Sequence, residues 1–479
     1  MAHCDQFKVL ANDQISPPHG SVPTTTIPLT FFDYLYVLGA GEDVIFYYEF
    51  PYPTHHFMET ILPCLKQSLS LTLKHFFTFV STLVIPPKPN KPYIRYVADS
   101  ESSVPFTVVE STVDFNHIVA DYQQDINKNL ESFLVPKKTC RNFLEDENGT
   151  RYVFPLLAIQ VTIMPNSGFC VVVNLHHLAA DGTAFKHFMK SWSSVCKRLL
   201  NISPNSKVED RNDYSSPIFN DGAMVQSPNE IELSFLNQVW KRAPEFFKML
   251  NGSWSGSSEA TLGNTANVKA TFKLSQVQVD KLKHWISHKY YECSAATNNG
   301  SEEKASTVRL STFIVTSSLI WVCWVKSEDN TKKEDEEHSY FFSADCRGRY
   351  EFVSIPSTYF GNFTAPVYVT LKRKQLIEEN GIVEAAKIIG NKLNDLDKNG
   401  VMKEAEKWIS NFADKIVSRS GILIAGSPKN NLNEIDFGVG RPKKCEFLGF
   451  YGGEGFSLFD CKDKNVGGLN LLWHLKGPK

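Results

Sequence analysis

The sequence predicts an α/β protein built as two lobes, and three observations lead to this expectation. The chain has 479 residues, which is more than one hydrophobic core usually serves. Strand-like and helix-like segments alternate in the first half, and the second half repeats this mixed pattern. Residues 201–230 are rich in Ser, Asn, Asp and Pro and lack periodicity, as expected of a connection. We therefore place one lobe at residues 1–204, a crossover loop at 205–232 and a second lobe at 233–479.

Hydrophobic spacing predicts the elements of the first half. Residues 44–53 (VIFYYEFPYP) are typical of a strand, and residues 57–76 carry apolar side chains at helical spacing. Two β-branched runs at 156–164 and 169–175 flank the sequence PNSG, which predicts a β-hairpin. The second run leads directly into HHLAADG, residues 176–182.

A buried helix is expected directly after this hairpin. Five large apolar side chains recur there at three- and four-residue spacing and form one face: Phe185, Phe188, Trp192, Val195 and Leu199. The segment HHLAADG therefore lies on a strand-to-helix turn. Another apolar run, residues 310–325, is interrupted by Ser and Thr and is too short to cross a bilayer, so it predicts a second buried helix.

Composition favours a small molecule as the partner. Fifty Lys and Arg residues stand against 52 Asp and Glu residues, so no overall charge attracts nucleic acid or an anionic membrane. The ten cysteines are scattered without a CxxC pair, which argues against a zinc site or a disulfide framework. The first residues lack the pattern of a secretory signal, and we expect a cytoplasmic protein.

His177 and Asp181 are the residues best suited to chemistry. They lie four apart on the predicted turn among Ala179, Ala180 and Gly182, whose small side chains let a substrate approach closely. A neutral imidazole accepts a proton near neutral pH, so His177 suits the role of general base toward a hydroxyl. Taken alone, the His-x-x-x-Asp spacing fits a structural histidine near a helix start equally well.

Two other chemistries fit this segment poorly. Adjacent His176 and His177 near a carboxylate resemble metal ligands, but consecutive strand residues point to opposite faces, and no HExxH motif or second His pair is present. We therefore expect no metal. The sequence also contains no G-x-S-x-G elbow, which leaves a serine hydrolase without a nucleophile.

Four motifs together carry a family resemblance. They are HHLAADG at 176–182, SADCRGR at 343–349, YFGNF at 359–363 and DFGVGRPKK at 436–444. In order and rough spacing they resemble the plant BAHD acyl-CoA-dependent acyltransferases, and the resemblance extends over nearly the whole chain. The YFGN and DCRGR segments look most like the branch that acylates anthocyanins, flavonoids and other phenolic glycosides.

The resemblance implies a fold and a set of site residues. It implies two chloramphenicol-acetyltransferase-like lobes with mixed sheets and flanking helices, and an active-site channel between them that acyl-CoA and the acceptor enter from opposite mouths. It makes His177 the base, while Asp181 holds the loop through an ionic contact and Asp436 is structural. The other motif positions that it marks are His176, Gly182, Arg347, Tyr359, Gly361, Asn362, Gly438 and Gly440.

Further roles follow for charged and polar residues. A buried carboxylate requires a cation, and Arg347 is our candidate partner for Asp181 or Asp436. Stretches that lie near the coenzyme in relatives contain hydroxyls and a cation suited to its phosphates, although ordinary loop or core roles fit each one singly: Ser311, Thr312, Ser427 and Lys429.

The sequence departs from the family pattern at several places. Val439 stands where relatives carry Trp, and Phe363 replaces Cys at the end of YFGNC. Loss of a Trp removes buried surface worth a few kcal/mol unless neighbours fill the space. Residues 77–83 (FTFVSTL) replace a Pro-Leu-Ala-Gly turn, and the end of the chain lacks a short amphipathic helix that relatives continue into, so we expect a shortened C-terminus.

The substrates are the least determined part of the prediction. A malonyl donor needs a cation, which Lys186 or His187 could supply, whereas a hydroxycinnamoyl donor needs an aromatic slot that Phe185 and Phe188 would form only if they left the core. We expect a malonyl or hydroxycinnamoyl group from acyl-CoA, no permanently bound cofactor, a phenolic or flavonoid glycoside as acceptor, and a monomer. The alternatives are a weakly active or non-catalytic paralogue that binds a phenolic ligand or a protein, and an N-acyltransferase acting on a polyamine.

Overall fold

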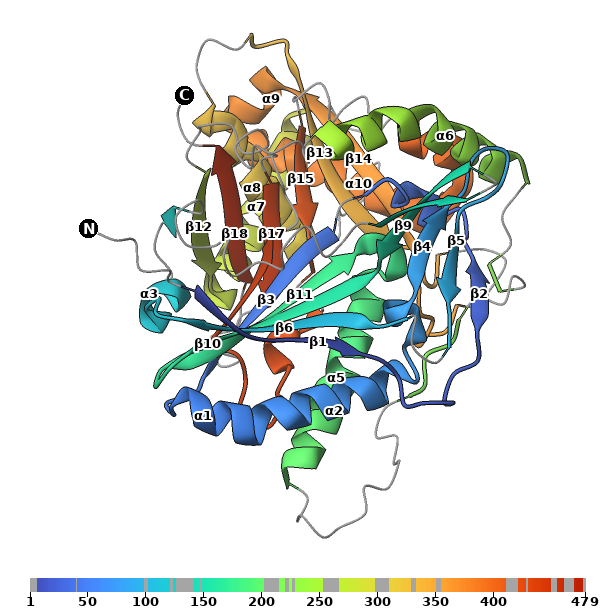
Figure 1. Ribbon diagram of the computed structural model, residues 1–479. Coiled ribbons are helices and arrows are strands. Elements are labelled where there is room, and N and C mark those ends of the chain that lie inside the picture. The colour runs from blue at the N-terminus through green and yellow to red at the C-terminus, as the bar shows by residue number, and fades with distance from the viewer. Residues whose placement is uncertain are drawn as a thin grey trace.

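Three β-sheets with helices packed against them make up the described part of the chain (Figure 1). The computed structural model describes residues 7–39, 41–98, 102–120, 124–125, 142–146, 149–201, 215–219, 224–225, 229–252, 267–297, 310–328, 333–349, 355–410, 421–427, 430–448, 455–460 and 469–476. This mixture of sheets and helices confirms the α/β fold class.

The HHLAADG turn directly follows a strand of a six-stranded sheet. Its order is β1-β6-β10-β11-β3-β16, in which β6 and β10 are parallel and the other neighbours are antiparallel. The strands are β1 (Phe7–Ile15), β3 (Gly41–Glu49), β6 (Val104–Ser111), β10 (Leu157–Met164), β11 (Gly168–His176) and β16 (Lys444–Leu448). The predicted hairpin is confirmed as β10 and β11. The predicted strand at 44–53 is confirmed as β3 but ends before Pro51, which has no N–H for a ladder.

The other two sheets extend the fold on either side. The seven-stranded sheet has the order β14-β13-β15-β17-β18-β12-β7, and the five-stranded sheet has the order β2-β5-β4-β9-β8. Their strands are β2 (Thr25–Pro28), β4 (Thr82–Ile85), β5 (Tyr93–Tyr96), β7 (Gln124–Asp125), β8 (Asn142–Asp146), β9 (Gly149–Pro155), β12 (Asn267–Leu274), β13 (Glu337–Asp345), β14 (Thr364–Lys372), β15 (Gly421–Ala425), β17 (Gly455–Asp460) and β18 (Leu469–Lys476).

Two strands cross between the halves of the chain. β16, from the second half, pairs with β3 in the six-stranded sheet, with Cys445 opposite Phe46. β7, from the first half, pairs with β12 in the seven-stranded sheet, with Asp125 opposite Val268. The halves are therefore joined by backbone pairing as well as by the connection between them.

Helices cover the sheets. α1 (Thr54–His56), α2 (Leu62–Leu73) and α5 (Gly182–Asn201) lie on one side of the six-stranded sheet, and α7 (Gln276–Thr297), α8 (Thr312–Ser327) and α10 (Gly381–Asn399) lie against the seven-stranded sheet (Figure 1). The remaining helices are α3 (Phe115–Val119), α6 (Asn229–Gly252) and α9 (Arg373–Ile377), with 3-10 turns η1 (Asp33–Leu35), η3 (Phe77–Val80), η6 (His177–Ala179), η7 (Met402–Lys407) and η9 (Leu432–Glu434). Among the helices described here, none is long and apolar enough to span a bilayer.

The predicted helix at 57–76 is interrupted. A π-helical turn, η2 (Phe57–Ile61), separates α1 from α2, and α2 ends at Leu73. Pro63 sits in the first turn of α2, where it has no N–H to return to the preceding turn, and this accounts for the change of winding there. The segment that replaces the family's turn forms η3, with Phe79 and Val80 buried.

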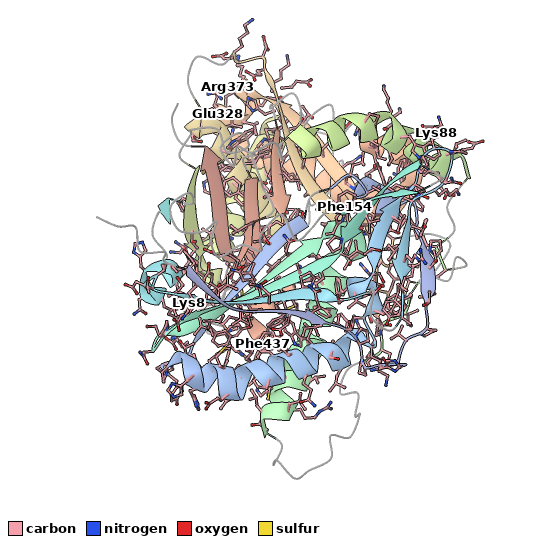
Figure 2. The ribbon with its side chains drawn as sticks, in the orientation of Figure 1. Lys8, Lys88, Phe154, Glu328, Arg373 and Phe437 are labelled. Carbon is pink, nitrogen blue, oxygen red and sulfur yellow. The ribbon has the colours of Figure 1, made fainter. Side chains whose placement is uncertain are left out.

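The predicted buried face of α5 is confirmed at Phe185, Phe188, Trp192 and Val195, whereas Leu199 is only half-buried, and α8 is confirmed as a buried helix. Trp192 of α5 is fully buried and donates its indole N–H to the Leu65 carbonyl (3.2 Å) and the Ser68 hydroxyl (3.0 Å) of α2. Phe437 packs on Trp192 with ring centroids 4.7 Å apart, in the layer between the sheet and α2 (Figure 2). In α8, buried residues occur on every face, including Trp321 and Trp324.

The predicted boundary between two lobes stays a prediction. Within 205–232 the described residues are 215–219, 224–225 and 229–232, and α6 already begins at Asn229. Ile218 forms an isolated parallel bridge with Tyr359, so this part of the connection lies against the YFGNF segment.

Candidate active site

The HHLAADG segment forms the predicted strand-to-helix turn. β11 ends at His176, η6 follows at once, and α5 begins at Gly182. A Cβ added at Gly182 would lie 2.8 Å from Nδ2 of Asn430, so a larger residue would displace that amide. The Asn430 side chain therefore lies against the start of α5.

His176 is buried and contacts the backbone of the turn. His176 is 5% exposed, and its Nδ1 accepts the Leu178 N–H at 3.3 Å. Burial, reinforced by the neighbouring His177, lowers the pKa of His176 to about 4. His176 is therefore neutral near pH 7 and holds the backbone of the turn.

Asp181 ties three parts of the chain together. It is 1% exposed, and its Oδ1 accepts the N–H groups of Thr183 (3.1 Å) and Ala184 (3.0 Å), which caps α5. Its Oδ2 accepts the Phe363 N–H at 3.0 Å and a guanidinium N–H of Arg347 at 2.8 Å. The carboxylate thus joins the turn to the YFGNF and DCRGR segments.

The structure decides between the two carboxylates considered for Arg347. Nη1 of Arg347 pairs with Asp181, and also with the half-exposed Asp345 at 3.0 Å. Asp436 instead pairs with Lys197 of α5 at 2.6 Å. The hypothesis of an Arg347 partner is confirmed for Asp181 and wrong for Asp436, because the DFGVG segment lies beside a later turn of α5 that carries its own cation.

The imidazole of His177 is held on one face and on one edge. The Tyr36 ring stacks on it with centroids 3.9 Å apart and planes 8° from parallel. Nδ1 of His177 lies 3.2 Å from Oδ1 of Asn362, in the YFGNF segment. The ring is thereby held by residues from both halves of the chain.

The hydrogen bonds of Asn362 define which way its amide points. Asn362 is fully buried, and Nδ2 lies within hydrogen-bonding distance of the carbonyls of His177 (3.0 Å) and Leu178 (2.9 Å) and of Oδ1 of Asp33 (3.1 Å). Three acceptors around this atom require it to be the amide nitrogen. Oδ1 therefore faces His177 as an acceptor, so Nδ1 carries the ring proton and Nε2 is left as the basic nitrogen.

Asp33 supports Asn362 and was not singled out in the sequence. It lies at the start of η1, is 7% exposed, and its Oδ2 accepts the Thr30 N–H (2.7 Å) and hydroxyl (2.8 Å). The signal was present in the segment PLTFFDYLYV, which resembles the family but contains no motif with an obvious chemical role. Tyr36 lies in the same segment and was missed for the same reason.

Glu42, at the start of β3, is a second carboxylate near His177. Burial raises the pKa of Glu42, and the nearby His177 offsets only part of this rise. Gly41, the residue before it, pairs with His176 across β3 and β11, which places Glu42 beside the turn. Sequence spacing could not reveal this neighbour because it depends on strand register.

Replacing Asp33 by Asn is expected to remove a pH-dependent loss of stability. Burial raises the pKa of Asp33 to about 6, against ~3.9 in an unfolded chain. The folded state binds this proton more tightly, so the contribution to stability is complete below about pH 4 and is lost as the pH rises through about 6. In urea titrations, the unfolding free energy of wild type relative to the variant should fall by up to about 3 kcal/mol over this range. A difference that does not change with pH would rule out the raised pKa.

The YFGNF segment packs tightly around Asn362. Tyr359 and Phe363 are buried, and Phe363 packs on Phe32 with ring centroids 4.6 Å apart. Gly361 has φ +147°, and a Cβ there would lie 3.0 Å from Oη of Tyr359, so the position favours glycine. Phe363, which departs from the family pattern, thus contributes to the core beside the site.

The DFGVG segment forms a turn on α5 away from His177. Oδ1 of Asp436 accepts the N–H groups of Gly438 (2.8 Å) and Gly440 (2.9 Å). Burial alone would raise the pKa of Asp436, but Lys197 and these two amides outweigh it and lower the pKa. Val439 is partly buried against the core. The contacts fit the structural role expected of Asp436.

Substituting Ala for Gly438 is expected to cost more stability than the same change at Gly440. Both have positive φ, +102° and +97°, so each substitution costs roughly 1–2 kcal/mol of backbone energy. A Cβ at Gly438 would also lie 2.7 Å from Cδ1 of Leu200, whereas none of the described atoms lies within 4 Å of a Cβ at Gly440. This contact is with the end of a half-buried leucine side chain, so moving it adds about 1 kcal/mol, the low end of the cost of overpacking. Calorimetric melting of both variants checks this, and equal losses would mean that the contact with α5 is unimportant.

Three of the four residues proposed to bind the coenzyme are described, and they lie at the start of α8 and just after β15. Ser311 is exposed and caps α8 by accepting the Ile314 N–H at 3.2 Å, and Thr312 begins that helix. Ser427 follows the end of β15. Lys429 lies outside the described residues. Their roles stay predictions.

The four residues considered for binding the acyl group lie in two different environments. Phe185 and Phe188 are buried in the core, as their spacing favours, and do not form an open slot. His187 contacts the Ser215 carbonyl through Nε2 at 2.7 Å, and burial lowers its pKa. Burial likewise lowers the pKa of Lys186, with a smaller effect from Lys190.

A model of the Transferase family matches residues 9–478. The chain belongs to this family. Its members include the acyl-CoA-dependent BAHD acyltransferases that the four motifs resemble, so the chain is an acyl-CoA-dependent acyltransferase.

Curated members of the Transferase family match this chain over almost its whole length. The coumaroyl-CoA:anthocyanidin 3-O-glucoside-6''-O-coumaroyltransferase 1 of Arabidopsis thaliana is 33% identical, covering 98% of this chain and 94% of that protein. The malonyl-coenzyme A:anthocyanin 3-O-glucoside-6''-O-malonyltransferase of Dahlia pinnata is 34% identical over 97% of this chain and 93% of its own. Phenolic glucoside malonyltransferase 1 of Nicotiana tabacum is 29% identical over 94% and 91%.

Solved structures of similar shape confirm the fold. Vinorine synthase superimposes with a TM-score of 0.60 at 14% identity, covering 98% of this chain and 95% of that structure. F. sporotrichioides TRI101, complexed with coenzyme A and T-2, has a TM-score of 0.60 at 15% identity, covering 94% and 95%. The chain thus has the chloramphenicol-acetyltransferase-like fold that the motifs implied.

Proposed function

We propose that this chain transfers a malonyl or hydroxycinnamoyl group from a coenzyme A thioester to a sugar hydroxyl of a flavonoid, anthocyanin or other phenolic glycoside. The names of its relatives support this substrate class, since they include a coumaroyltransferase and malonyltransferases of anthocyanin and phenolic glucosides. The observation that carries the mechanism is the contact between Nδ1 of His177 and Oδ1 of Asn362.

His177 acts as the general base through Nε2. Nδ1–H of His177 donates a hydrogen bond to Oδ1 of Asn362, which leaves the lone pair of Nε2 available to the acceptor hydroxyl. The stacked Tyr36 ring favours this position of the imidazole, because an aromatic pair of this kind contributes about 1 kcal/mol. Base catalysis of this kind accelerates a reaction by about 10²- to 10⁴-fold.

The transfer proceeds by direct attack. The hydroxyl gives its proton to Nε2 of His177 as its oxygen bonds to the thioester carbonyl carbon, which forms a tetrahedral intermediate. Collapse of the intermediate breaks the C–S bond, and the imidazolium returns the proton to the departing thiolate. The products are the acylated glycoside and free coenzyme A, and His177 is neutral again.

Other residues position these groups. Asp181 and Arg347 lock the turn to the DCRGR segment and so fix where His177 sits. Ser311, Thr312, Ser427 and Lys429 bind the coenzyme, whose phosphates suit hydroxyls and an ammonium group. We further propose that the protein acts as a monomer in the cytoplasm, with a channel between lobes divided at residues 205–232.

A matrix of donors and acceptors tests this function. The purified protein is incubated with malonyl-, coumaroyl-, caffeoyl- or acetyl-CoA and with an anthocyanidin 3-O-glucoside, a simple phenolic glucoside, their aglycones or spermidine, and products are identified by mass spectrometry. We expect malonylated or hydroxycinnamoylated glucosides and unmodified aglycones. Acylated spermidine would instead identify a polyamine N-acyltransferase, and acetyl-CoA as the best donor would overturn the proposed acyl group. Absence of every product, despite thermal stabilisation by acyl-CoA, would identify a non-catalytic binding paralogue.

A further inference from the structure

Glu42 lies on the face of the six-stranded sheet that leads to His177. In β3, Val44 belongs to the large hydrophobic core, whereas Ile45 packs in a smaller core on the opposite face. Because side chains alternate along a strand, Glu42 shares the face of Val44. Its partner across the ladder is Leu175 of β11, two residues before His177. Diagonal neighbours of this kind are about 7–8 Å apart, within reach of a long side chain.

The carboxylate of Glu42 acts on both stacked rings of the site. Burial raises the pKa of Tyr36, and the nearby Glu42 adds to this rise. His177, on which the Tyr36 ring stacks, in turn offsets part of the effect of burial on Glu42. The Glu42 side chain keeps part of its surface exposed. A substrate group that reaches the His177 ring therefore comes close to this carboxylate.

The charge of Glu42 is not neutralised by a lysine or arginine in the part of the chain that the structure describes. There, neither kind of residue forms an ion pair with its carboxylate. The guanidinium of Arg347, on the other side of the turn, is bound by Asp181 and Asp345. A negative charge near the reacting ring is thus left without a cationic side chain beside it.

The two cations of α5 that were considered for a donor carboxylate interact with other groups. Lys186 is affected by the charges of Lys190 and Glu434. His187 contacts the Ser215 carbonyl through Nε2 at 2.7 Å. Their interactions give no support for a cation that would hold a malonyl carboxylate.

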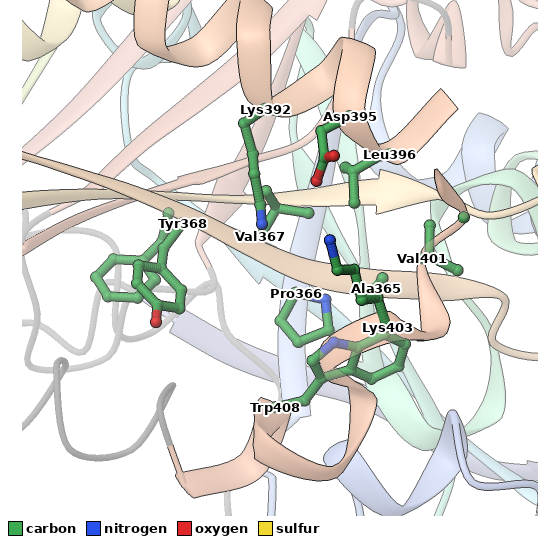
Figure 3. Close-up of a pocket in the computed structure, with 12 residues that line it drawn as sticks. Ala365, Pro366, Val367, Tyr368, Lys392, Asp395, Leu396, Val401, Lys403 and Trp408 are labelled. Carbon is green, nitrogen blue, oxygen red and sulfur yellow. The ribbon is translucent and has the colours of Figure 1, made fainter. Parts of the chain in front are cut away.

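Two further lysines line a cavity in the second half of the chain. Lys392 of α10 and Lys403 of η7 face this cavity, and β14 contributes another wall (Figure 3). The residues that line it include neither Tyr36 nor Asn362, which contact the His177 ring. These lysines are therefore not part of the contacts around the ring.

The two donor classes differ in charge next to the reacting carbonyl. A malonyl group carries a carboxylate two bonds from the thioester carbonyl carbon, so its charge stays near the site of attack beside His177. A hydroxycinnamoyl group is neutral at this position. At an effective dielectric constant of about 20, like charges about 8 Å apart repel enough to change a binding constant by tenfold or more.

We propose that Glu42 is a specificity residue that favours a neutral hydroxycinnamoyl donor over a malonyl donor by repelling the malonyl carboxylate. This inference deepens the proposed function and rests on it, because it names which of the two acyl groups the chain prefers.

Binding and transfer with donors of matched size test the proposal. Malonyl-CoA and butyryl-CoA have acyl groups of similar size, and only the first is charged at its end. Dissociation constants are measured by calorimetry without acceptor at pH 8, which favours the ionised form of Glu42. We expect Glu42→Gln to bind malonyl-CoA about tenfold more tightly than wild type and butyryl-CoA equally well. With an anthocyanidin 3-O-glucoside, kcat/KM for malonyl-CoA should rise by a similar factor, while that for coumaroyl-CoA stays within about threefold.

Two variants separate this effect from a general change of charge. Glu49, at the other end of β3, is exposed and pairs with Lys443, so Glu49→Gln should leave the donor preference unchanged. Glu42→Asp keeps the charge and should keep the preference of wild type. Because Glu42→Gln is expected to gain affinity for one donor, damage to the fold cannot imitate the result.

The remaining outcomes each have a definite meaning. Equal changes for malonyl-CoA and butyryl-CoA, or no change for either, would overturn the proposal. A loss of kcat with every donor would assign Glu42 to the acceptor or to His177 and would overturn it as well. If no donor acylates a glucoside, the proposed function fails, whereas the calorimetric comparison still decides whether Glu42 discriminates between the donors.

Discussion

Replacing His177 by Ala is expected to lower kcat for acyl transfer by about 10²- to 10⁴-fold. Without the imidazole, the enzyme lacks the group that we propose takes the acceptor proton as the tetrahedral intermediate forms. Tyr36 and Asn362 keep their other contacts, including the Tyr36 hydroxyl contact with Thr364, so the fold should persist. Steady-state kinetics with the best donor and acceptor from the matrix measure the effect.

His176→Asn is the matched control for this experiment. His176 lies on the same turn, and its role is to accept the Leu178 N–H, which an Asn side chain oxygen can also do. We expect this variant to keep activity within about tenfold of wild type. Both variants should show the same thermal stabilisation by coenzyme A, which separates chemistry from binding. A His177→Ala enzyme that also works within tenfold of wild type would remove His177 from the mechanism.

Replacing Arg347 by Met is expected to lower the free energy of unfolding by about 3–5 kcal/mol. Asp181 is 1% exposed, and loss of the guanidinium leaves its carboxylate buried with backbone N–H partners alone. A surviving folded fraction should also lose activity, because the turn that carries His177 is no longer tied to the DCRGR segment. Chemical denaturation at neutral pH gives the stability.

The second partner of Arg347 provides the control. Asp345 is half exposed, so Asp345→Asn should cost less than about 1 kcal/mol. The double variant Arg347→Met with Asp181→Asn should recover part of the loss, since it leaves no buried charge. If Arg347→Met is no more harmful than Asp345→Asn, the buried ion pair does not hold the turn.

The sequence could predict the turn and its ion pair because both follow from local or pairwise rules. Alternating β-branched runs and helical apolar spacing placed His177 between a strand and a helix, and the structure confirms this. A buried carboxylate needs a cation, which led to Arg347. The same rule could not choose between Asp181 and Asp436, because the choice depends on which segment α5 packs against.

The surroundings of the His177 ring were not predictable in this way. Tyr36, Asp33 and Glu42 reach the turn from the N-terminal part of the chain, and nothing in their local pattern marks them. Asn362 was marked only by the family motif, and its hydrogen bonds to two backbone carbonyls became apparent in three dimensions. Such contacts depend on tertiary packing rather than on spacing along the chain.

Strand exchange was missed for a related reason. β16 and β7 are short and pair with strands from the other half of the chain, so no hairpin or periodicity signal marks their partners. The helix at 57–76 was predicted as continuous because apolar spacing does not distinguish a π-helical turn from α-helix.

The protonation of the His177 ring tests the central claim most directly. The claim is that Asn362 holds the proton on Nδ1 and leaves Nε2 as the base. Proton–nitrogen correlation spectra of the imidazole, recorded well above pH 7 on ¹⁵N-labelled protein and assigned with His177→Gln, report which nitrogen carries hydrogen. We predict a proton on Nδ1 and none on Nε2. A proton on Nε2 would contradict the account, because that nitrogen could not then accept the proton of an acceptor hydroxyl.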